Sequence, residues 1–534
     1  MRTKITVCLF LIVQVFSVYS QEFTWATSVS GSDTEIGVKM VKDSSGDIYI
    51  IGHSRSNPFI YEGISYPTNG NGGDAFFAKL DTNKELVWMK SMGGNDQIYF
   101  DKAIDIHIDT FGDIYLSVNS TGENFRYDGL LLSGIDSPGQ YSGEAVLIKV
   151  NSNGDYIWHD SGTASSSLLG MTTDTNGNLY VTGYFARDIT LGGVITLTNP
   201  SSGTTIDLLV AKYQPDGTIL WAKNAGGTPH NTFAYGIDIE INPQSNEIIV
   251  LAKGDGDVYF DGVPMPVNNG SDEGNLLVSY GADGTQNWIK RILDDQDFGY
   301  GDCNSIGISS SGIIGVCGWT NGTTAEGLVG FYDNQGFVIS EHTYPSGDDL
   351  LIHSIAFNEF GEVYLSGRCN DGAVLGISPG TVTLTDRTGF IVKMDTQQQV
   401  AWVTEFESYF ESRVFYDNGS ILYACTIGED FIYNSGQDII IPDSGDAVFA
   451  EMPDNTLGVD NYIAEPVSVY PNPTSGLLVI ETNSLQHVKV YDIRGILLET
   501  SDNNEIDLSQ YSRGVYLIKI ITDKGTTVKK VILK

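Results

Sequence analysis

The chain has few basic residues and few cysteines for its length. It has 534 residues with 29 Lys plus Arg against 67 Asp plus Glu, so its formal net charge is −38 at pH 7. A charge of this sign repels phosphate backbones and anionic headgroups, which argues against nucleic acid and peripheral membrane binding. Four of the 5 cysteines follow residue 20: Cys303, Cys317, Cys369 and Cys425. They are too few for a disulfide scaffold and lack C-x-x-C metal spacing.

Signature motifs of several enzyme classes are also absent. The 7 histidines are scattered and none forms H-E-x-x-H, so a zincin is excluded. There is no G-x-S-x-G segment, although a triad assembled from distant parts of the chain stays open. Carboxylates are abundant, but most aspartates, such as Asp43 and Asp109, lie in turns that need them structurally. The S-x-D-x-G-x-x-W box of sialidases is not matched, because Asp216 directly precedes Gly217.

Residues 1–20 have the pattern of a secretory signal peptide. Arg2 and Lys4 precede a mostly apolar stretch from Ile5 to Val18. This stretch is about 14 residues and too short to span a membrane, and no later stretch is long enough. Cys8 lies inside the apolar stretch, which disfavours a lipoprotein. We expect a secreted, soluble mature chain without membrane insertion.

The chain is rich in glycine and aromatic residues and contains a repeat. Its 61 Gly, 28 Tyr and 23 Phe suit many short strands joined by tight turns. A motif of two apolar strands around an Asx- and Gly-containing turn recurs about every 63 residues, and it predicts a hairpin. The seven copies are DSSGDIYIIG from Asp43, DTFGDIYLSV from Asp109, DTNGNLYVTG from Asp174, NEIIVLAKG from Asn246, SSSGIIGVCG from Ser309, NEFGEVYLSG from Asn358 and DNGSILYAC from Asp417.

A second motif follows the first and predicts another hairpin. In four copies a lysine precedes a tryptophan by nine residues, and in two others Ser279 precedes Trp288 and Phe331 precedes Ser340 by the same offset. The lysine and tryptophan pairs are Lys79 and Trp88, Lys149 and Trp158, Lys212 and Trp221, and Lys393 and Trp402. Two hairpins per copy give four strands, the size of one propeller blade.

The seventh copy lacks its last strand. The segment AVFAEM from Ala447 places Glu451 at the lysine position, but no tryptophan follows at the usual offset. Phe23-Thr24-Trp25-Ala26 is similar to the missing segment and precedes the first repeat without a partner. We predict that this N-terminal strand completes the seventh copy, because closing the ring removes both exposed sheet edges.

The phrases GNLYVTG and VAKYQPDGTILW resemble the seven-bladed β-propeller repeats, called SBBP repeats, of secreted bacterial proteins, over residues 21–456. The resemblance implies an all-β, seven-bladed propeller closed by its N-terminal strand. It implies no particular activity, because propellers host lectins, hydrolases and scaffolds. The altered fifth copy predicts an irregular blade there. We interpret the repeated tryptophans as residues that pin neighbouring blades together, not as the lining of a cofactor site.

Residues 461–534 differ in charge from the preceding chain. They contain eight Lys plus Arg and eight Asp plus Glu, so this region is neutral and marks a domain boundary. Alternating apolar residues around a turn with Pro471, Pro473 and Gly476 predict a small Ig-like β-sandwich.

The motifs of this region resemble the type A sorting domain of the type IX secretion system of Bacteroidetes. The residues that carry the resemblance are Pro471, Asn472, Pro473, Thr474, Gly476, Tyr491, Gly495, Gly514, Tyr516, Lys530 and Lys534. The resemblance implies delivery to the outer cell surface or medium and two partners, the translocon and the surface protease that removes the domain. The alternative is a permanent accessory domain. The predicted domains are a signal peptide (1–20), a propeller (21–456), a linker (457–466) and the sorting domain (467–534).

One segment contains oxygen ligands at a spacing that suggests calcium. LAKGDGDVYFDG includes Asp255, Asp257 and Asp261, but it lacks the closing acidic residue of the D-x-D-x-D-G-x5-E loop. We interpret it as a polar hairpin and expect no cofactor, with calcium kept as the alternative.

Cys303 and Cys317 flank the turn from Ser309 to Gly312. They are nearly opposite on one hairpin, which allows a disulfide, but strict register pairs residue 303 with residue 318. Free buried thiols and a disulfide both stay open.

The functional hypothesis is a secreted or cell-surface propeller that acts as a binding or scaffold module for a glycan or protein ligand. No catalytic residue is assigned. The alternative is a carbohydrate-active hydrolase with carboxylates at the propeller mouth, which several carboxyl groups of raised pKa in one funnel would favour. An inert module for adhesion is a third hypothesis.

Overall fold

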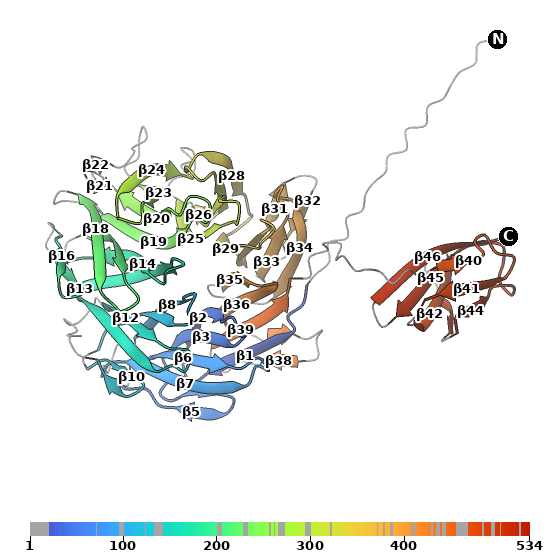
Figure 1. Ribbon diagram of the computed structural model, residues 1–534, viewed down its shortest axis with the longest axis horizontal. Helices are drawn as coiled ribbons and strands as arrows, with labels where there is room; N and C mark the ends of the chain where they lie inside the picture. The colour runs from blue at the N-terminus through green and yellow to red at the C-terminus, as the bar shows by residue number, and fades with distance from the viewer. Residues whose placement is uncertain are drawn as a thin grey trace, which may run out of the picture. The chain divides into compact units, whose positions relative to one another are not determined.

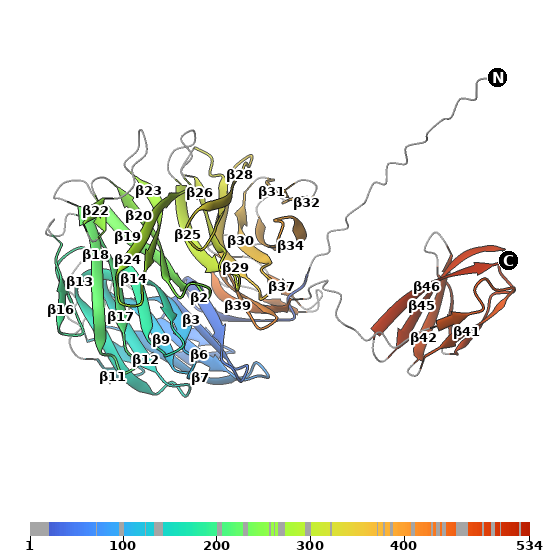
Figure 2. The ribbon, with the colours of Figure 1, turned by 45° about the horizontal axis from the view of Figure 1, so that its top comes forward.

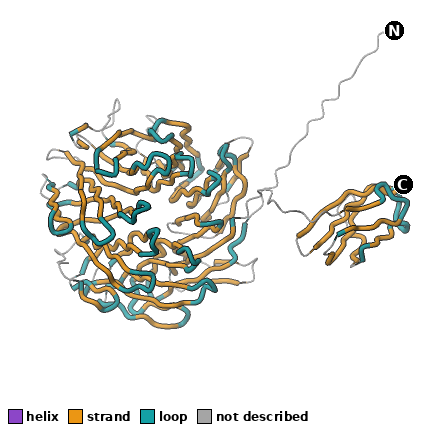
Figure 3. The backbone as a smooth tube through the Cα atoms, viewed as in Figure 1, coloured by secondary structure: helices purple, strands orange, loops and turns teal. Residues whose placement is uncertain are grey.

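The computed structural model forms two compact units, Met1–Asp454 and Asn455–Lys534 (Figure 1). It describes residues 21–534 except 71, 96–100, 123, 133–142, 200–204, 228–232, 256–257, 261, 265–272, 294–300, 321–322, 371, 378–379, 385–387, 407–411, 429–430, 434–437, 441–444, 455–467, 483–484, 493–496, 502 and 523–524. The expected signal peptide and linker lie outside these residues. The described residues form strands, turns and loops, and none of them forms a helix able to span a membrane (Figure 3).

The first three copies of the repeat form antiparallel sheets in chain order. The strands of the first copy are β2 (Glu35–Lys42), β3 (Ile48–Ser54), β6 (Ala75–Leu80) and β7 (Leu86–Gly93), extended by β10 (Arg126–Tyr127) and β11 (Leu130–Leu131). Those of the second and third are β8 (Lys102–Ile108), β9 (Ile114–Ser120), β12 (Glu144–Val150), β13 (Tyr156–Thr173), β14 (Leu179–Phe185), β17 (Asp207–Tyr213) and β18 (Ile219–Gly227), extended by β21 (Val258–Phe260) and β22 (Val263–Pro264). The long strand β13 ends the second copy and begins the third.

The fourth, fifth and sixth copies each form a four-stranded sheet. These are β19 (Phe233–Ile241), β20 (Ile248–Asp255), β23 (Gly274–Tyr280) and β24 (Gln286–Ile292); β25 (Gly301–Ile308), β26 (Ile314–Thr320), β27 (Gly327–Tyr332) and β28 (Val338–Tyr344); and β29 (Leu350–Phe357), β30 (Val363–Cys369), β33 (Thr388–Met394) and β34 (Val400–Phe406). Short hairpins are β15 (Ile189–Leu191) with β16 (Ile195–Leu197), β31 (Val374–Ile377) with β32 (Gly380–Thr383), and β37 (Phe431–Tyr433) with β38 (Asp438–Ile440).

The last copy contains strands from both ends of the first unit. Its sheet order is β35 (Ser412–Asp417), β36 (Ser420–Ile427), β39 (Asp446–Pro453), β1 (Trp25–Ser30), β4 (Phe59–Tyr61) and β5 (Ile64–Tyr66). Trp25 pairs with Glu451, as Trp88 pairs with Lys79 in the first copy. The predicted partner of the N-terminal strand is therefore confirmed.

The sheets of the first unit follow one another around a common centre, and none of them closes on itself (Figures 1 and 2). The first strand of each copy, for example β2, β8 and β19, lies nearest the centre (Figure 1). The Asx turns hold the hairpins as predicted: Asp43 Oδ1 accepts the N–H groups of Ser45 at 2.9 Å and Asp47 at 3.1 Å. Gly46 takes the positive φ of 87° that this turn requires.

The repeated tryptophans contact the following copy. The indole Nε1 of Trp158 donates to the Pro215 carbonyl at 3.0 Å, and Lys149 Nζ donates to the same oxygen at 3.1 Å. A Cβ on Gly217 would lie 2.9 Å from the Trp158 ring, so only glycine permits this approach. Trp221 and Lys212 contact the Ala282 carbonyl in the same way. The structure thus places these tryptophans at the contacts between copies.

Contacts between neighbouring copies are also present in the copies that lack the lysine and tryptophan of the second motif. In the fifth copy Ser340 replaces the tryptophan and accepts a hydrogen bond from Gln398 Nε2 at 2.7 Å, and His342 also bonds Gln398. The sheet of this copy keeps the order β25-β26-β27-β28, so the prediction of an irregular blade is wrong. Polar contacts replace the indole contact here. In the last copy Glu451 contacts Lys42 and Lys84 of the first copy.

Removing one of these indoles should destabilise the first unit. Trp158→Ala is expected to lower the free energy of unfolding by about 3 kcal/mol, because a half-buried aromatic contact and a hydrogen bond between copies are lost. Phe360, which is 66% exposed, is the matched control, and Phe360→Ala should change stability by less than about 0.5 kcal/mol. Urea unfolding measures both, and equal losses would contradict a pinning role.

The second unit is a two-sheet structure. One sheet is β40 (Ser468–Tyr470), β41 (Leu477–Glu481) and β44 (Glu505–Asp507), and the other is β43 (Leu497–Ser501), β42 (Leu485–Asp492), β45 (Gly514–Thr522) and β46 (Gly525–Leu533). Apolar residues such as Leu478, Val490 and Ile518 are fully buried in its own core.

Candidate functional site

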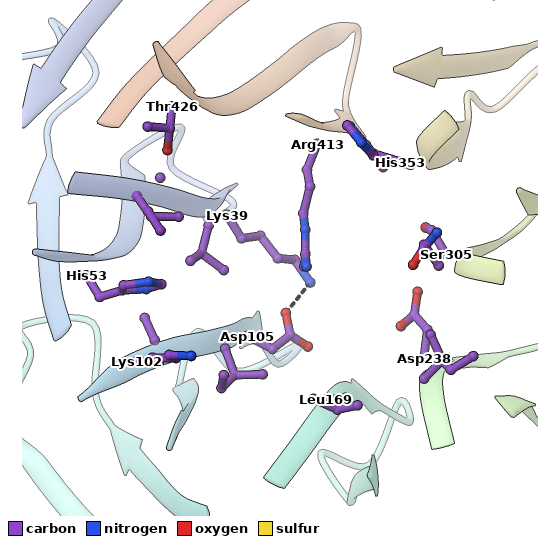
Figure 4. A pocket seen from close by; sticks show the side chains of 18 of the residues that line it. Lys39, His53, Lys102, Asp105, Leu169, Asp238, Ser305, His353, Arg413 and Thr426 are labelled. Atoms are coloured by element: carbon purple, nitrogen blue, oxygen red, sulfur yellow. Dashed lines mark hydrogen bonds and ion pairs between the residues drawn. The ribbon is translucent and has the colours of Figure 1, made fainter. Parts of the chain in front are cut away.

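The central strands of the first unit line one cavity of about 650 Å³. Residues of β2, β8, β13, β19, β25, β29 and β35 contribute to it, so the repeats share its wall (Figure 4). A cavity of this size lies within the range of small-molecule sites, which is about 300–1,000 Å³.

A β-bulge in six of these strands supplies cavity-lining side chains. The register shifts lie between Gly37 and Lys39, and at the equivalent points of β8, β13, β19, β25 and β29. A bulge inserts one extra residue and re-aims its side chain. The extra residues all line the cavity: Val38, Ile104, Leu169, Ile237, Asn304 and His353. One part of the wall is therefore apolar and another polar. The pairing of β35 is continuous, and this strand contributes Arg413 and Phe415.

Asp105 and Asp238 connect neighbouring central strands. Asp105 accepts the N–H of Met171 at 3.0 Å and forms an ion pair with Lys39 at 2.7 Å (Figure 4). Burial by itself lowers the pKa of Lys39, but the Asp105 carboxylate raises it and the net shift is upward. Asp238 accepts the N–H groups of Ile239 at 2.9 Å and Ile306 at 3.1 Å. Both carboxylates are thus occupied by backbone amides.

Two carboxyl groups near the centre have raised pKa values. Burial, with Asp105 nearby, raises the pKa of Asp238 to about 6, and burial together with Asp238 raises that of Glu240 to about 8. This is the signature that would favour a hydrolase. However, both oxygens of Asp238 bind backbone N–H groups, and Glu240 is not among the residues lining the cavity. The raised pKa values therefore follow from burial of structural groups.

The cavity concentrates basic residues in an acidic protein. Among the residues that the structure describes, its lining includes the basic Lys39, Arg55, Lys102 and Arg413 and only two acidic residues, Asp105 and Asp238. The formal balance of these side chains is +2, against −38 for the chain. The Arg413 side chain points into the cavity (Figure 4). Arg413 pairs through its backbone with Ala424 of β36, and within the described part of the chain its guanidinium makes no hydrogen bond or ion pair.

His353 is a buried neutral group of this wall. Its side chain is 7% exposed, and Nδ1 accepts the N–H of Ser412 at 3.1 Å. Burial, with Arg368 and Arg413 nearby, lowers the pKa of His353 to about 3. The Trp319 ring meets it edge-on at 5.6 Å between centroids.

The low pKa of His353 predicts a sign for the pH dependence. An unfolded histidine takes up a proton near pH 6.5, whereas folded His353 does not until about pH 3, so acidification favours the unfolded chain. At pH 5 this costs about 2 kcal/mol relative to pH 7.5. Asp238 acts oppositely, because its raised pKa lets the folded chain take up its proton first.

The contribution of His353 to the pH dependence is measured as the difference in unfolding free energy between the unmodified protein and a His353 variant. His353→Gln should be less stable than the unmodified protein at pH 7.5, and the gap should narrow by about 2 kcal/mol at pH 5. Urea unfolding at both pH values measures the two gaps. A gap that does not change with pH would contradict a neutral His353.

The four described cysteines are buried, and none of them forms a disulfide. Cys303 pairs with Gly318 and Ser305 with Cys317, since the bulge at Asn304 shifts the register. Of the two alternatives for Cys303 and Cys317, the structure has buried thiols without a disulfide. In the calcium segment Asp257 and Asp261 lie outside the described residues, and no group of three metal-ligating side chains occurs within the described ranges.

The structure brings several of the sorting residues together. Asn472 Nδ2 donates to the Lys530 carbonyl at 2.7 Å, and the Lys534 N–H donates to the Thr474 carbonyl at 2.9 Å. Thr474 is buried, and its hydroxyl donates to Leu477. The Pro-Asn-Pro-Thr segment thus attaches to the last strand, β46. Pro471, Pro473 and Gly476 lie in the turns beside it, Tyr491, Gly514 and Tyr516 lie in β42 and β45, and Gly495 lies outside the described residues.

Comparison with known proteins identifies the second unit. The model of a family described as a secretion system C-terminal sorting domain matches residues 468–534. The second unit is therefore a type IX secretion sorting domain, which implies interaction with that secretion system. The protein is exported to the cell surface or secreted.

The first unit has more distant similarities. The chain is 23% identical over 288 residues to an uncharacterized WD repeat-containing protein of Acanthamoeba polyphaga mimivirus, covering 46% of this chain and 19% of that protein, so it spans about a fifth of that relative. A Bacteroides caccae structure of unknown function is 10% identical with a TM-score of 0.32, covering 62% of this chain and 90% of its own. A quinohemoprotein alcohol dehydrogenase of Pseudomonas putida is 11% identical with a TM-score of 0.39, and the match covers 85% of this chain and 78% of that one. These similarities support no argument about function.

Proposed function

We propose that the first unit is a seven-bladed β-propeller closed by β1. The seven copies in the sequence support this count, as do the contacts that continue from Trp158 in the second copy to Glu451 in the last. The pairing of β1 with β39 supports the closure.

The propeller serves as a binding module at the cell surface. The observation that carries this proposal is the cavity at its centre, to which the central strands contribute apolar, aromatic and basic side chains. The hydrolase alternative has less support, because the carboxylates that line the cavity are bonded to backbone amides. In this proposal residues 1–20 direct entry into the periplasm, the sorting domain directs passage through the translocon, and a surface protease then removes that domain.

A glycan array tests the binding role. The purified full-length protein should retain a subset of glycans, and incubation with the same glycans should release no product detectable by mass spectrometry. Released sugars would instead favour the hydrolase. An array without any retained glycan would overturn the proposal of a glycan-binding module.

A further inference from the structure

The charge of the central cavity is opposite to that of the chain. Only 29 of the 534 residues are Lys or Arg, yet four of them line this single cavity. Acidic residues are more than twice as numerous, at 67, but among the described residues only Asp105 and Asp238 contribute to the wall. Basic residues spread over the surface would offset the acidic charge equally well, so the stability of the protein does not require them to gather in one cavity. Their position in the cavity therefore points to an anionic ligand.

The two carboxylates that line the cavity are bonded to other groups, so the guanidinium of Arg413 is available to a ligand. Asp105 is used by Lys39 at 2.7 Å and by the Met171 N–H at 3.0 Å. Asp238 is used by the N–H groups of Ile239 and Ile306. Among the described residues, neither carboxylate forms an ion pair with Arg413, whose side chain extends into the cavity (Figure 4). A guanidinium in this position can bind a carboxylate through two parallel N–H···O bonds.

The remainder of the wall suits an organic ligand larger than an inorganic ion. A cavity of about 650 Å³ far exceeds the volume of a single anion. Trp319 offers an aromatic surface, and the Ser305 hydroxyl points into the hollow opposite His53 and Lys102 (Figure 4). Aromatic and hydroxyl groups together recognise the C–H faces and hydroxyl groups of sugars, whereas the basic groups recognise an acid.

We propose that the central cavity binds a saccharide carrying a carboxylate, with Arg413 as the residue that holds the carboxylate. The inference rests on the proposed binding role and specifies its ligand class. Arg55 and Lys102 attract the acid to the cavity, so affinity falls as ionic strength rises.

Titration calorimetry of the full-length protein with glucuronate, glucose and sulfate tests the ligand class. Glucuronate should bind at least tenfold more tightly than glucose or sulfate. Equal affinity for glucose would overturn the requirement for an acid while leaving a glycan-binding role intact. Equal affinity for sulfate would reduce the site to an inorganic anion site, and no binding of glucuronate would overturn the inference outright.

Arg413→Gln tests the residue. It should weaken glucuronate binding at least tenfold. Arg413→Lys keeps the charge but loses the planar guanidinium, so its affinity for glucuronate should lie between those of the unmodified protein and Arg413→Gln. Arg187→Gln is the matched control: it removes the same charge from an exposed position outside the cavity and should leave affinity within twofold. A thermal melt confirms that each variant is folded, and Lys102→Gln, at an exposed position, provides a second test. Unchanged affinity in folded Arg413→Gln would refute the assignment.

Discussion

A chain that begins at residue 31 should be less stable than the full chain by about 4 kcal/mol, because it lacks β1. Val29 is fully buried and Phe23 is 3% exposed, and each such side chain contributes about 1.5–3 kcal/mol through burial. β1 also joins β39 to the β4–β5 hairpin, since Val29 pairs with both Ala447 and Tyr61. Its loss leaves β39 as an open sheet edge.

Addition of the missing strand in trans tests this more sharply than the deletion alone. A synthetic peptide of residues 21–30 should bind the shortened chain and restore most of its thermal stability, whereas a scrambled peptide of the same composition should not. Urea unfolding and thermal melts follow both effects. A shortened chain as stable as the full one, with no response to the peptide, would mean that β1 does not hold the ring together.

The repeats could be predicted from the sequence because their signature residues serve local structure. The offset of nine residues between Lys149 and Trp158 is the offset of a tight hairpin, and the two residues do face each other across β12 and β13. Glu451 at the lysine position and Trp25 at the start of the chain were visible for the same reason. Residues that repeat in sequence report a repeated local environment, so the pattern indicates the element without the rest of the fold.

The candidate site could not be predicted in this way. Its residues differ from copy to copy, as with Val38, Leu169 and His353 at equivalent bulges, and they come together only around the centre of the unit. The bulges themselves leave little trace, because one extra residue in a central strand does not change the alternation elsewhere. The signal that could have indicated Arg413 is a basic residue in a central strand of an acidic chain, a feature that it shares with Lys39 and Lys102.

The two units also differ in how much of their role could be predicted from the sequence. The sorting residues lie within one small unit, where Asn472 and Thr474 form hydrogen bonds with Lys530 of the last strand and with Lys534, which follows it. The ligand proposed for the cavity has no corresponding signature in the sequence. The sequence therefore defines delivery better than the proposed binding role. The two roles are assigned to separate units, and the second unit has its own core.

Removing residues 455–534 should abolish export while leaving the first unit folded. The matched family covers residues 468–534, and the first unit has its own sheets and cores, so its fold does not need the second unit. In a host with a type IX secretion system, we expect at least a tenfold loss of protein from the cell surface and medium, with the shortened chain retained inside the outer membrane.

Cell fractionation measures the location, and limited proteolysis of the retained chain shows whether it is folded. Thr474→Asn is a finer variant, because a larger side chain at this buried position disturbs the contact with β46 without removing any domain; it should reduce export in the same direction. Phe360→Ala, an exposed change in the first unit, should export normally. A shortened chain that reaches the surface would refute the sorting role. An exported chain whose intact mass still includes Lys534 would contradict only removal of the domain, because an uncut domain can still have directed export.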